Sequence, residues 1–182
     1  LCRLPLSLAL IFSGFVKAID PLGTQYKIGD YLEALHLEQY APSWATLTTS
    51  VLLSAVEFCL GVFLLFAIRR RKVSRVIVAF MAIMTAITVW LWGWEPIKDC
   101  GCFGDAIHLT NGETLLKNLL LLAMAAVVAW KPFCMVRFIS KTNQWIVINY
   151  TLLFILVSSA LSLWYLPPFD FRPYHIGADI RK

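Results

Sequence analysis

Five long apolar stretches, separated by polar segments, constrain this chain more than any other feature of its sequence. They cover residues 3–19, 44–68, 73–94, 115–136 and 145–166. A helix needs about 20 residues to cross the hydrocarbon core of a bilayer, and four of the five stretches reach that length. Only 15% of the residues are charged, against roughly 25% in soluble domains. The sequence therefore predicts an all-α, polytopic membrane bundle of about five transmembrane helices.

The first stretch is the shortest, and it resembles the apolar part of a signal peptide. A removable signal peptide would be followed by a cleavage site with two small residues. Lys17, Asp20 and Pro21 occupy that position instead. We therefore expect a retained first helix.

Positively charged residues gather in the links between the second and third stretches and between the fourth and fifth. They are Arg69, Arg70, Arg71, Lys72 and Arg75 in the first link, and Lys131, Arg137 and Lys141 in or near the second. Dense positive charge in short loops marks the cytoplasmic side. We therefore expect a cytoplasmic amino end and an extracytoplasmic carboxyl end. The net charge of +5 then reflects membrane orientation, and no nucleic-acid partner is expected.

Tryptophan residues fall near the ends of the predicted spans. Trp44, Trp92, Trp94 and Trp164 would lie at the outer ends, and Trp130 and Trp145 towards the inner ends. Indole rings prefer the boundary between headgroups and acyl chains. This distribution agrees with the orientation that the basic links predict.

The predicted organisation has two parts: residues 1–166 form the bundle, and residues 167–182 form an extracytoplasmic tail. Within the bundle, two segments between the spans are predicted to lie on the outer side. In segment 21–43, Ile28, Tyr31, Leu32 and Leu35 recur at roughly helical spacing. This pattern favours an interfacial helix on the outer leaflet, with an ordinary ordered loop as the alternative. The second segment is the loop 95–114.

The loop 95–114 contains a cysteine pair separated by one glycine, Cys100-Gly101-Cys102. A disulfide between residues so close in sequence is strained, and strain raises the reduction potential. The ring also closes too few residues to stabilise the fold much. Thiol–disulfide chemistry is therefore favoured over a structural role. The alternatives are an inert pair in a tight turn and an incomplete metal site with His108.

Residues around the cysteine pair would tune its thiols. Thr110 and Glu113 form a possible capping box, which would point the positive end of the fourth helix towards the loop. Lys117 would add positive potential, which lowers a thiol pKa. Two aspartates, Asp99 and Asp105, would act in the opposite direction. The candidate proton carriers on this side are His36 and His108.

A set of motifs between about residue 3 and residue 136 matches a known family; they are Ser13-Gly14-Phe15-Val16-Lys17, Asp20-Pro21, Tyr31, Glu57, Gly61, Asp99-Cys100-Gly101-Cys102-Phe103-Gly104-Asp105, Thr114 and Lys117-Asn118. In these residues the chain resembles the MauE/DoxX-like redox-associated membrane proteins of bacterial inner membranes. The resemblance implies thiol–disulfide maturation of extracytoplasmic proteins in the MauE branch and quinone-linked oxidation in the DoxX branch. It makes Cys100 and Cys102 the redox pair, with Lys117 and Asn118 in support. Candidate quinone contacts are Glu57, Trp92, Trp94 and Phe103.

Glu57 is the acidic residue inside a predicted span, at a depth similar to Ser13 and Thr85. Because an ionised carboxylate is costly in lipid, such a residue usually has a partner or a shifted pKa. Glu57 is therefore either a neutral acid hydrogen-bonded between helices or a group that passes protons to or from a quinone. Cys59 and Cys134 are interpreted as small apolar fillers, rather than as a thiol relay across the membrane.

Together these features predict a membrane-embedded thiol–disulfide redox protein, with thiol–disulfide oxidoreductase as the candidate enzyme class. Its partner would be an extracytoplasmic thioredoxin-like or client protein, and a membrane quinone is the one cofactor considered. The alternative is a non-enzymatic scaffold that anchors an extracytoplasmic complex. A transporter that uses Glu57 is disfavoured, because the sequence has neither internal repeats nor broken helices.

Overall fold

The computed structural model of the chain describes residues 2–35, 42–94, 110–132, 135–136, 138–140 and 142–164. Its elements are α1 (Arg3–Ile19), α2 (Pro21–Ala34), α3 (Ser43–Leu65), α4 (Arg70–Trp94), α5 (Asn111–Trp130) and α6 (Gln144–Trp164). All of the regular secondary-structure elements in the described residues are α-helices, which confirms the predicted all-α fold.

Four of these helices, α3 to α6, are long and apolar enough to cross a membrane. The remaining pair, α1 and α2, passes the same test when it is taken together, although it bends by 96° at its junction. The number of spans in the described residues is therefore four or five, in agreement with the prediction. The protein is a multi-pass membrane protein whose outward apolar side chains contact lipid.

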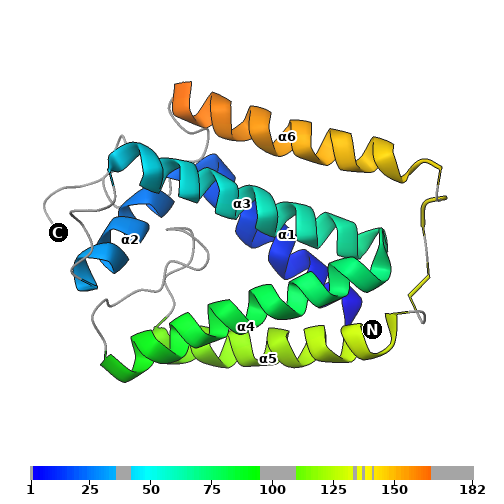
Figure 1. Cartoon of the computed structure of the whole chain (residues 1–182), viewed down its shortest axis with the longest axis horizontal. Coiled ribbons are helices and arrows are strands. Elements are labelled where there is room, and N and C mark those ends of the chain that lie inside the picture. The colour runs from blue at the N-terminus through cyan, green and yellow to red at the C-terminus, as the bar shows by residue number, and fades with distance from the viewer. Residues whose placement is uncertain are drawn as a thin grey trace, which may run out of the picture.

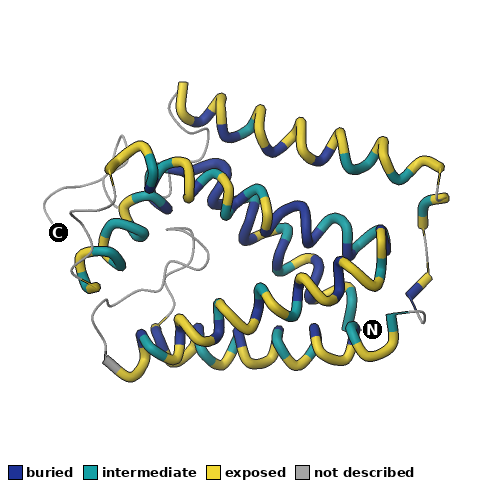
Figure 2. Tube along the Cα trace, viewed as in Figure 1, coloured by how far each residue is buried: buried dark blue, intermediate teal, exposed yellow. Residues whose placement is uncertain are grey.

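The helices are arranged around a central pair, α1 and α3, which lie side by side (Figure 1). The hairpin of α4 and α5 packs on one side of this pair and α6 on the other. Much of the surface of α4, α5 and α6 is exposed, whereas α1 is buried along most of its length (Figure 2). The first helix is thus the centre of the bundle.

Two glycines allow α1 and α3 to approach backbone to backbone. A Cβ atom at Gly14 would lie 2.5 Å from the backbone nitrogen of Phe58, and one at Gly61 would lie 2.7 Å from that of Ile11. Larger residues would not fit at either position without a shift of the backbone. Small residues at helix interfaces are a general device of membrane bundles, because they increase van der Waals contact where no hydrophobic effect acts between helices.

The apolar core joins the central pair to the α4–α5 hairpin. Its buried members come mainly from four helices and include Leu6, Leu10, Leu64, Ile77, Leu121 and Ala125. The sixth helix packs on the opposite face, where the ring of Phe154 stacks against Phe58 at a centroid distance of 5.6 Å. The central pair is therefore covered on both sides.

The ends of two spans differ from the prediction for local reasons. The fourth span was predicted over 115–136, but α5 begins at Asn111, directly after its capping box, and ends at Trp130. Lys131 is non-helical, as expected for a residue that precedes a proline. The second span was predicted to reach residue 68, whereas α3 ends at Leu65 and a turn with positive φ at Ala67 and Arg69 follows.

The bend between α1 and α2 is built at Asp20. Its carboxylate accepts a hydrogen bond from the Gly23 backbone at 3.0 Å, and Pro21 occupies the first position of α2. Both features favour a new helix start. Ser50 on α3 donates to the Pro21 carbonyl at 2.7 Å, which holds α2 against α3. The helix predicted in 21–43 is thus present, while its position on the outer leaflet stays a prediction.

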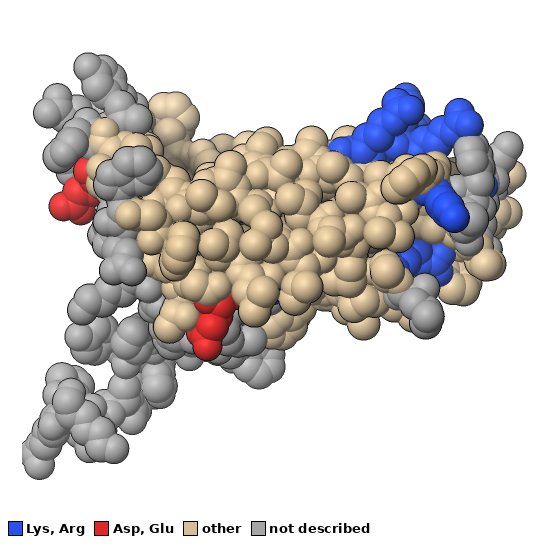
Figure 3. All heavy atoms as spheres, turned by 90° about the horizontal axis from the view of Figure 1, so that it is seen from below, with Lys and Arg blue, Asp and Glu red and all other residues tan. Residues whose placement is uncertain are grey.

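Charged residues mark the two ends of the bundle (Figure 3). Arg3 begins α1, Arg69 directly precedes α4, Arg70–Lys72 begin it, and Lys131 follows α5; we call this the basic end. The opposite end, where α4 ends and α5 starts, is called the loop end. The last residues of α5 and α6, Trp130 and Trp164, are 85% and 86% exposed. The side of the membrane that each end faces stays a prediction.

Candidate functional site

The predicted redox pair, Cys100 and Cys102, lies outside the described residues. So do the neighbouring candidates Asp99, Phe103, Asp105 and His108, together with His36 and Cys134, and the side chain of Trp94. Their roles stay predictions. The described candidates are Glu57, Trp92, Lys117 and Asn118.

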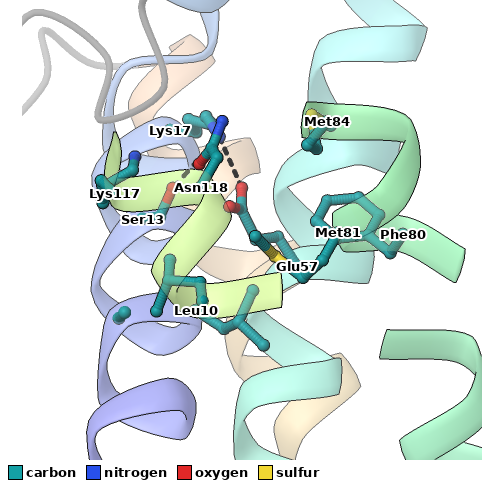
Figure 4. A pocket seen from close by; sticks show the side chains of 11 residues that line it. Leu10, Ser13, Lys17, Glu57, Phe80, Met81, Met84, Lys117 and Asn118 are labelled. Atoms are coloured by element: carbon teal, nitrogen blue, oxygen red, sulfur yellow. Dashed lines mark hydrogen bonds and ion pairs between the residues drawn. The ribbon is translucent and has the colours of Figure 1, made fainter. Parts of the chain in front are cut away.

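Glu57 forms a buried ion pair with Lys17. The Lys17 ammonium nitrogen lies 2.5 Å from Glu57 Oε2, and the two side chains are only 5% and 9% exposed. Lys17 Nζ also donates to the hydroxyl oxygen of Ser13 at 3.1 Å, one helical turn away on α1 (Figure 4). The predicted partner for Glu57 therefore exists, but it is a lysine. Sequence reasoning recognised Glu57 and missed Lys17.

The close crossing of α1 and α3 places the two charges together. Lys17 stands in the last turn of α1, three residues after Gly14, and Glu57 immediately precedes Phe58. Since Gly14 brings the α1 backbone against Phe58, the neighbouring side chains must meet at short range. The contact between Lys17 and Glu57 could not be predicted from their positions in the sequence, because 40 residues separate them.

The α4–α5 hairpin adds a second polar group that faces the pair. Asn118 on α5 is buried and donates from Nδ2 to the hydroxyl oxygen of Thr88 at 2.8 Å. The Thr88 hydroxyl in turn donates to the Met84 carbonyl at 2.7 Å. The bond between Asn118 and Thr88 joins α5 to α4 and fixes the Asn118 amide. Thr85 was predicted to lie at a depth similar to Glu57. Its hydroxyl donates to the Met81 carbonyl on the same helix, α4.

A small cavity lies between these groups. It has a volume of about 20 Å³, and its polar lining comes from Ser13, Lys17, Glu57, Lys117 and Asn118. A space of roughly 10–15 Å³ or more, measured in this way, can hold one water molecule when two to four polar partners surround it. The cavity therefore has room for about one water. On the side of the α4–α5 hairpin, apolar side chains of α4 line the cavity, among them Met81 and Met84 (Figure 4).

The cavity lies close to the loop end. Lys117 is six residues after Asn111, the first residue of α5. At about 1.5 Å per residue, it stands about 9 Å below the start of that helix. Thr110 accepts a hydrogen bond from the Glu113 backbone, and the Glu113 carboxylate accepts one from the Thr110 backbone. The predicted capping box is thus confirmed, and the positive end of α5 adjoins the loop that carries Cys100 and Cys102.

The described quinone candidates do not share one site. Trp92 is 57% exposed, and its indole nitrogen would lie 3.9 Å from a Cβ atom at Gly112, near the start of α5. It does not line the cavity beside Glu57. The structure therefore brings Glu57 together with Lys117 and Asn118 and leaves Trp92 at the rim of the bundle.

The two described cysteines occupy different environments. Cys59 is buried within α3, in keeping with an apolar filler, and Cys2 is partly buried beside the start of α1. Neither is in a disulfide. The described residues contain no group of three His, Cys, Asp or Glu side chains that could hold a metal ion.

The sequence was compared with models of known protein families. The model of the family described as methylamine utilisation protein MauE matches residues 1–131. The chain belongs to the MauE family. The MauE match covers α1 to α5, and hence the Lys17–Glu57 pair, the residues around its cavity and the Cys-Gly-Cys loop. The sixth helix lies beyond the MauE match. Comparisons with curated proteins and with solved structures gave no match.

Proposed function

We propose that this MauE-family protein is a membrane thiol–disulfide redox protein in which Cys100 and Cys102 exchange disulfides with an extracytoplasmic protein. The Lys17–Glu57 pair would handle the protons that accompany this exchange. The observation that carries the proposal is a buried ion pair beside a cavity with room for one water. Lys117, which lines this cavity, stands about 9 Å below the helix start that follows the cysteine loop.

The exchange balances without an external oxidant. A thiolate of the reduced pair attacks the disulfide of the partner, forms a mixed disulfide and releases one partner thiolate. The second cysteine then attacks the mixed disulfide, so that Cys100 and Cys102 become oxidised and the partner becomes a dithiol. Two electrons and two protons pass to the partner in total, and the reverse sequence runs in the same way. In the reverse direction Cys100 and Cys102 end as a dithiol, and a membrane quinone that accepts two electrons and two protons from it would regenerate their disulfide.

A proton site suits the ion pair better than a purely structural role. Buried ion pairs are weak contributors to stability, because the cost of removing both charges from water offsets their attraction. The crossing at Gly14 and Gly61 already holds α1 against α3 through backbone contact. An ionisable group within a membrane helix is accordingly a functional candidate by default.

Glu57 is the proton acceptor in this proposal. When a proton reaches its carboxylate through the cavity, the acid becomes neutral, and Lys17 keeps its hydrogen bond to Ser13. When the proton leaves, the ion pair reforms. Lys17 and Lys117 line the same cavity and place two basic side chains beside this carboxylate.

The partner and the compartment follow from the same proposal. The cysteine loop would face the outside of a bacterial inner membrane and meet a thioredoxin-like or client protein there. Replacement of Cys102 by serine should trap a mixed disulfide between Cys100 and the partner if Cys100 attacks first. Non-reducing electrophoresis followed by mass spectrometry would identify the adduct. The Cys100→Ser variant is the matched control for the order of attack.

Two outcomes would count against the redox function. One is the absence of an adduct from both single variants, with unchanged thiol status in extracytoplasmic proteins. The other is a Cys100–Cys102 pair that does not titrate when membranes are equilibrated with a thiol buffer series and then alkylated. A Cys100→Ser/Cys102→Ser double variant with full activity would support the scaffold alternative instead.

A further inference from the structure

A larger cleft lies at the basic end, away from the Lys17–Glu57 pair. Its volume is about 510 Å³, and the start of α1, the end of α5 and the residues that follow α5 line it. The proposed redox function makes no use of this cleft. Among the described residues that line it, Cys2, Arg3 and Lys131 are polar and the others are apolar.

Two arginines from different helices hold the wall of the cleft in place. Arg3 donates from Nη1 to the Val136 carbonyl at 2.8 Å, and Arg70 donates from Nη1 to the Met135 carbonyl at 2.7 Å. The Arg3 guanidinium also lies over the ring of Phe138, 4.8 Å from its centroid. Met135, Val136 and Phe138 are therefore held by contacts to α1 and α4, and these contacts shape one wall of the cleft.

Charge and apolar surface occupy different depths of the cleft. Arg3 and Lys131 lie at the basic end, at the start of α1 and directly after α5. Val127 and Val128 line the cleft about one turn further along α5, which is roughly 5 Å deeper in the bundle. A ligand that fits this arrangement carries negative charge at one end and an apolar chain at the other.

We infer that this cleft binds an anionic phospholipid, with its phosphate between Arg3 and Lys131 and part of an acyl chain against Leu4, Val127 and Val128. A cleft with apolar walls at the edge of a bilayer fills with acyl chains more favourably than with water. Basic pockets between membrane helices recognise anionic headgroups by charge. A zwitterionic lipid offers the same chain but no net charge for the two cations.

The test uses the whole chain in nanodiscs of phosphatidylcholine with or without phosphatidylglycerol. Because Cys2 lines the cleft, its alkylation by a maleimide, followed by peptide-resolved mass spectrometry, reports occupancy. We expect slower alkylation with phosphatidylglycerol. Lys131→Gln should weaken the apparent affinity about fivefold, the effect of one cation near an anionic headgroup. Lys72→Gln is the matched control, because Lys72 is exposed at the same end and does not line the cleft.

A second measurement guards against a change of fold in the variants. Native mass spectrometry should find phosphatidylglycerol retained by the wild type and by Arg3→Lys, and lost from Arg3→Gln. Equal Cys2 alkylation in both lipid compositions, or equal effects of Lys131→Gln and Lys72→Gln, would overturn the inference. Protection of Cys2 by inorganic phosphate in phosphatidylcholine nanodiscs would also overturn it, because the site would then bind free phosphate and not a lipid.

Discussion

Gly14 and Phe58 stand so close that a Cβ atom at the glycine would lie 2.5 Å from the Phe58 backbone nitrogen. This contact sets the distance between α1 and α3, and it lies next to the Lys17–Glu57 pair along both helices. The packing of the bundle and the geometry of its buried charges therefore depend on the same crossing. A change at Gly14 should affect both.

Replacement of Gly14 by valine should destabilise the protein by about 1–3 kcal/mol, the usual cost of overpacking. The added side chain would push α1 away from α3 and lengthen the Lys17–Glu57 contact. Thermal unfolding in detergent micelles, followed by the fluorescence of a thiol-reactive dye, measures the loss. Gly93→Val is the matched control, since nothing lies within 4 Å of a Cβ atom there. Equal stability of the two variants would contradict the assigned role of Gly14.

The number of helices and the position of the first one could be predicted from the sequence. Apolar stretches of about 20 residues fix the spans, since lipid leaves few alternatives to a helix for an apolar segment. The first helix has the predicted bounds, Arg3–Ile19. The ends of α5 were predicted less well, because apolar residues continue past Trp130 while Pro132 ends the helix.

The partner of Glu57 could not be predicted in the same way. Lys17 stands near the end of a short apolar stretch, where a lysine usually reaches the headgroups. Its burial depends on side chains of α3, α4 and α5, which line the same cavity. One signal was available: Ser13 and Lys17 are four residues apart, so they share a helix face. That spacing marks a polar face but does not identify Glu57 as its partner.

The hydrogen bond between Asn118 and Thr88 should contribute measurably to the docking of α5 on α4. Hydrogen bonds between membrane helices average about 0.6 kcal/mol and reach about 1.7 kcal/mol. We expect Asn118→Leu and Thr88→Val each to destabilise the protein, with a double variant less affected than the sum. A double-mutant cycle of thermal stability measures the coupling. Strict additivity of the two effects would indicate that the bond contributes nothing.

The capping box at the start of α5 should hold the first turn of that helix. Thr110→Ala removes the oxygen that accepts the Glu113 backbone hydrogen bond, and loss of such a cap typically costs about 1 kcal/mol. Hydrogen exchange at residues 111–114 should therefore become faster, whereas Thr110→Ser should keep the protection. If both variants exchange like the wild type, the cap does not determine the order of the turn that follows the cysteine loop.

The Lys17–Glu57 pair allows stability and function to be separated. Lys17→Met or Glu57→Leu alone should destabilise the protein by about 3–5 kcal/mol, because each leaves one buried charge without its partner. The double variant replaces both charges with apolar groups and should recover most of the stability. A proton site predicts that this stable double variant still exchanges disulfides slowly. Thermal unfolding and the rate of exchange with a model disulfide measure the two properties.

The pH dependence of the exchange rate distinguishes a proton site from a structural contact. Of the described side chains that line the cavity, Lys17, Glu57 and Lys117 are the titratable ones, and removal of the first two should change the profile. Glu57→Asp keeps a carboxylate and should retain a pH profile similar to that of the wild type at a lower rate. Glu57→Gln keeps the shape of the side chain and should retain only the pH dependence that thiol ionisation gives to any disulfide exchange. A double variant of Lys17 and Glu57 with the wild-type rate and profile would mean that the pair only holds helices together.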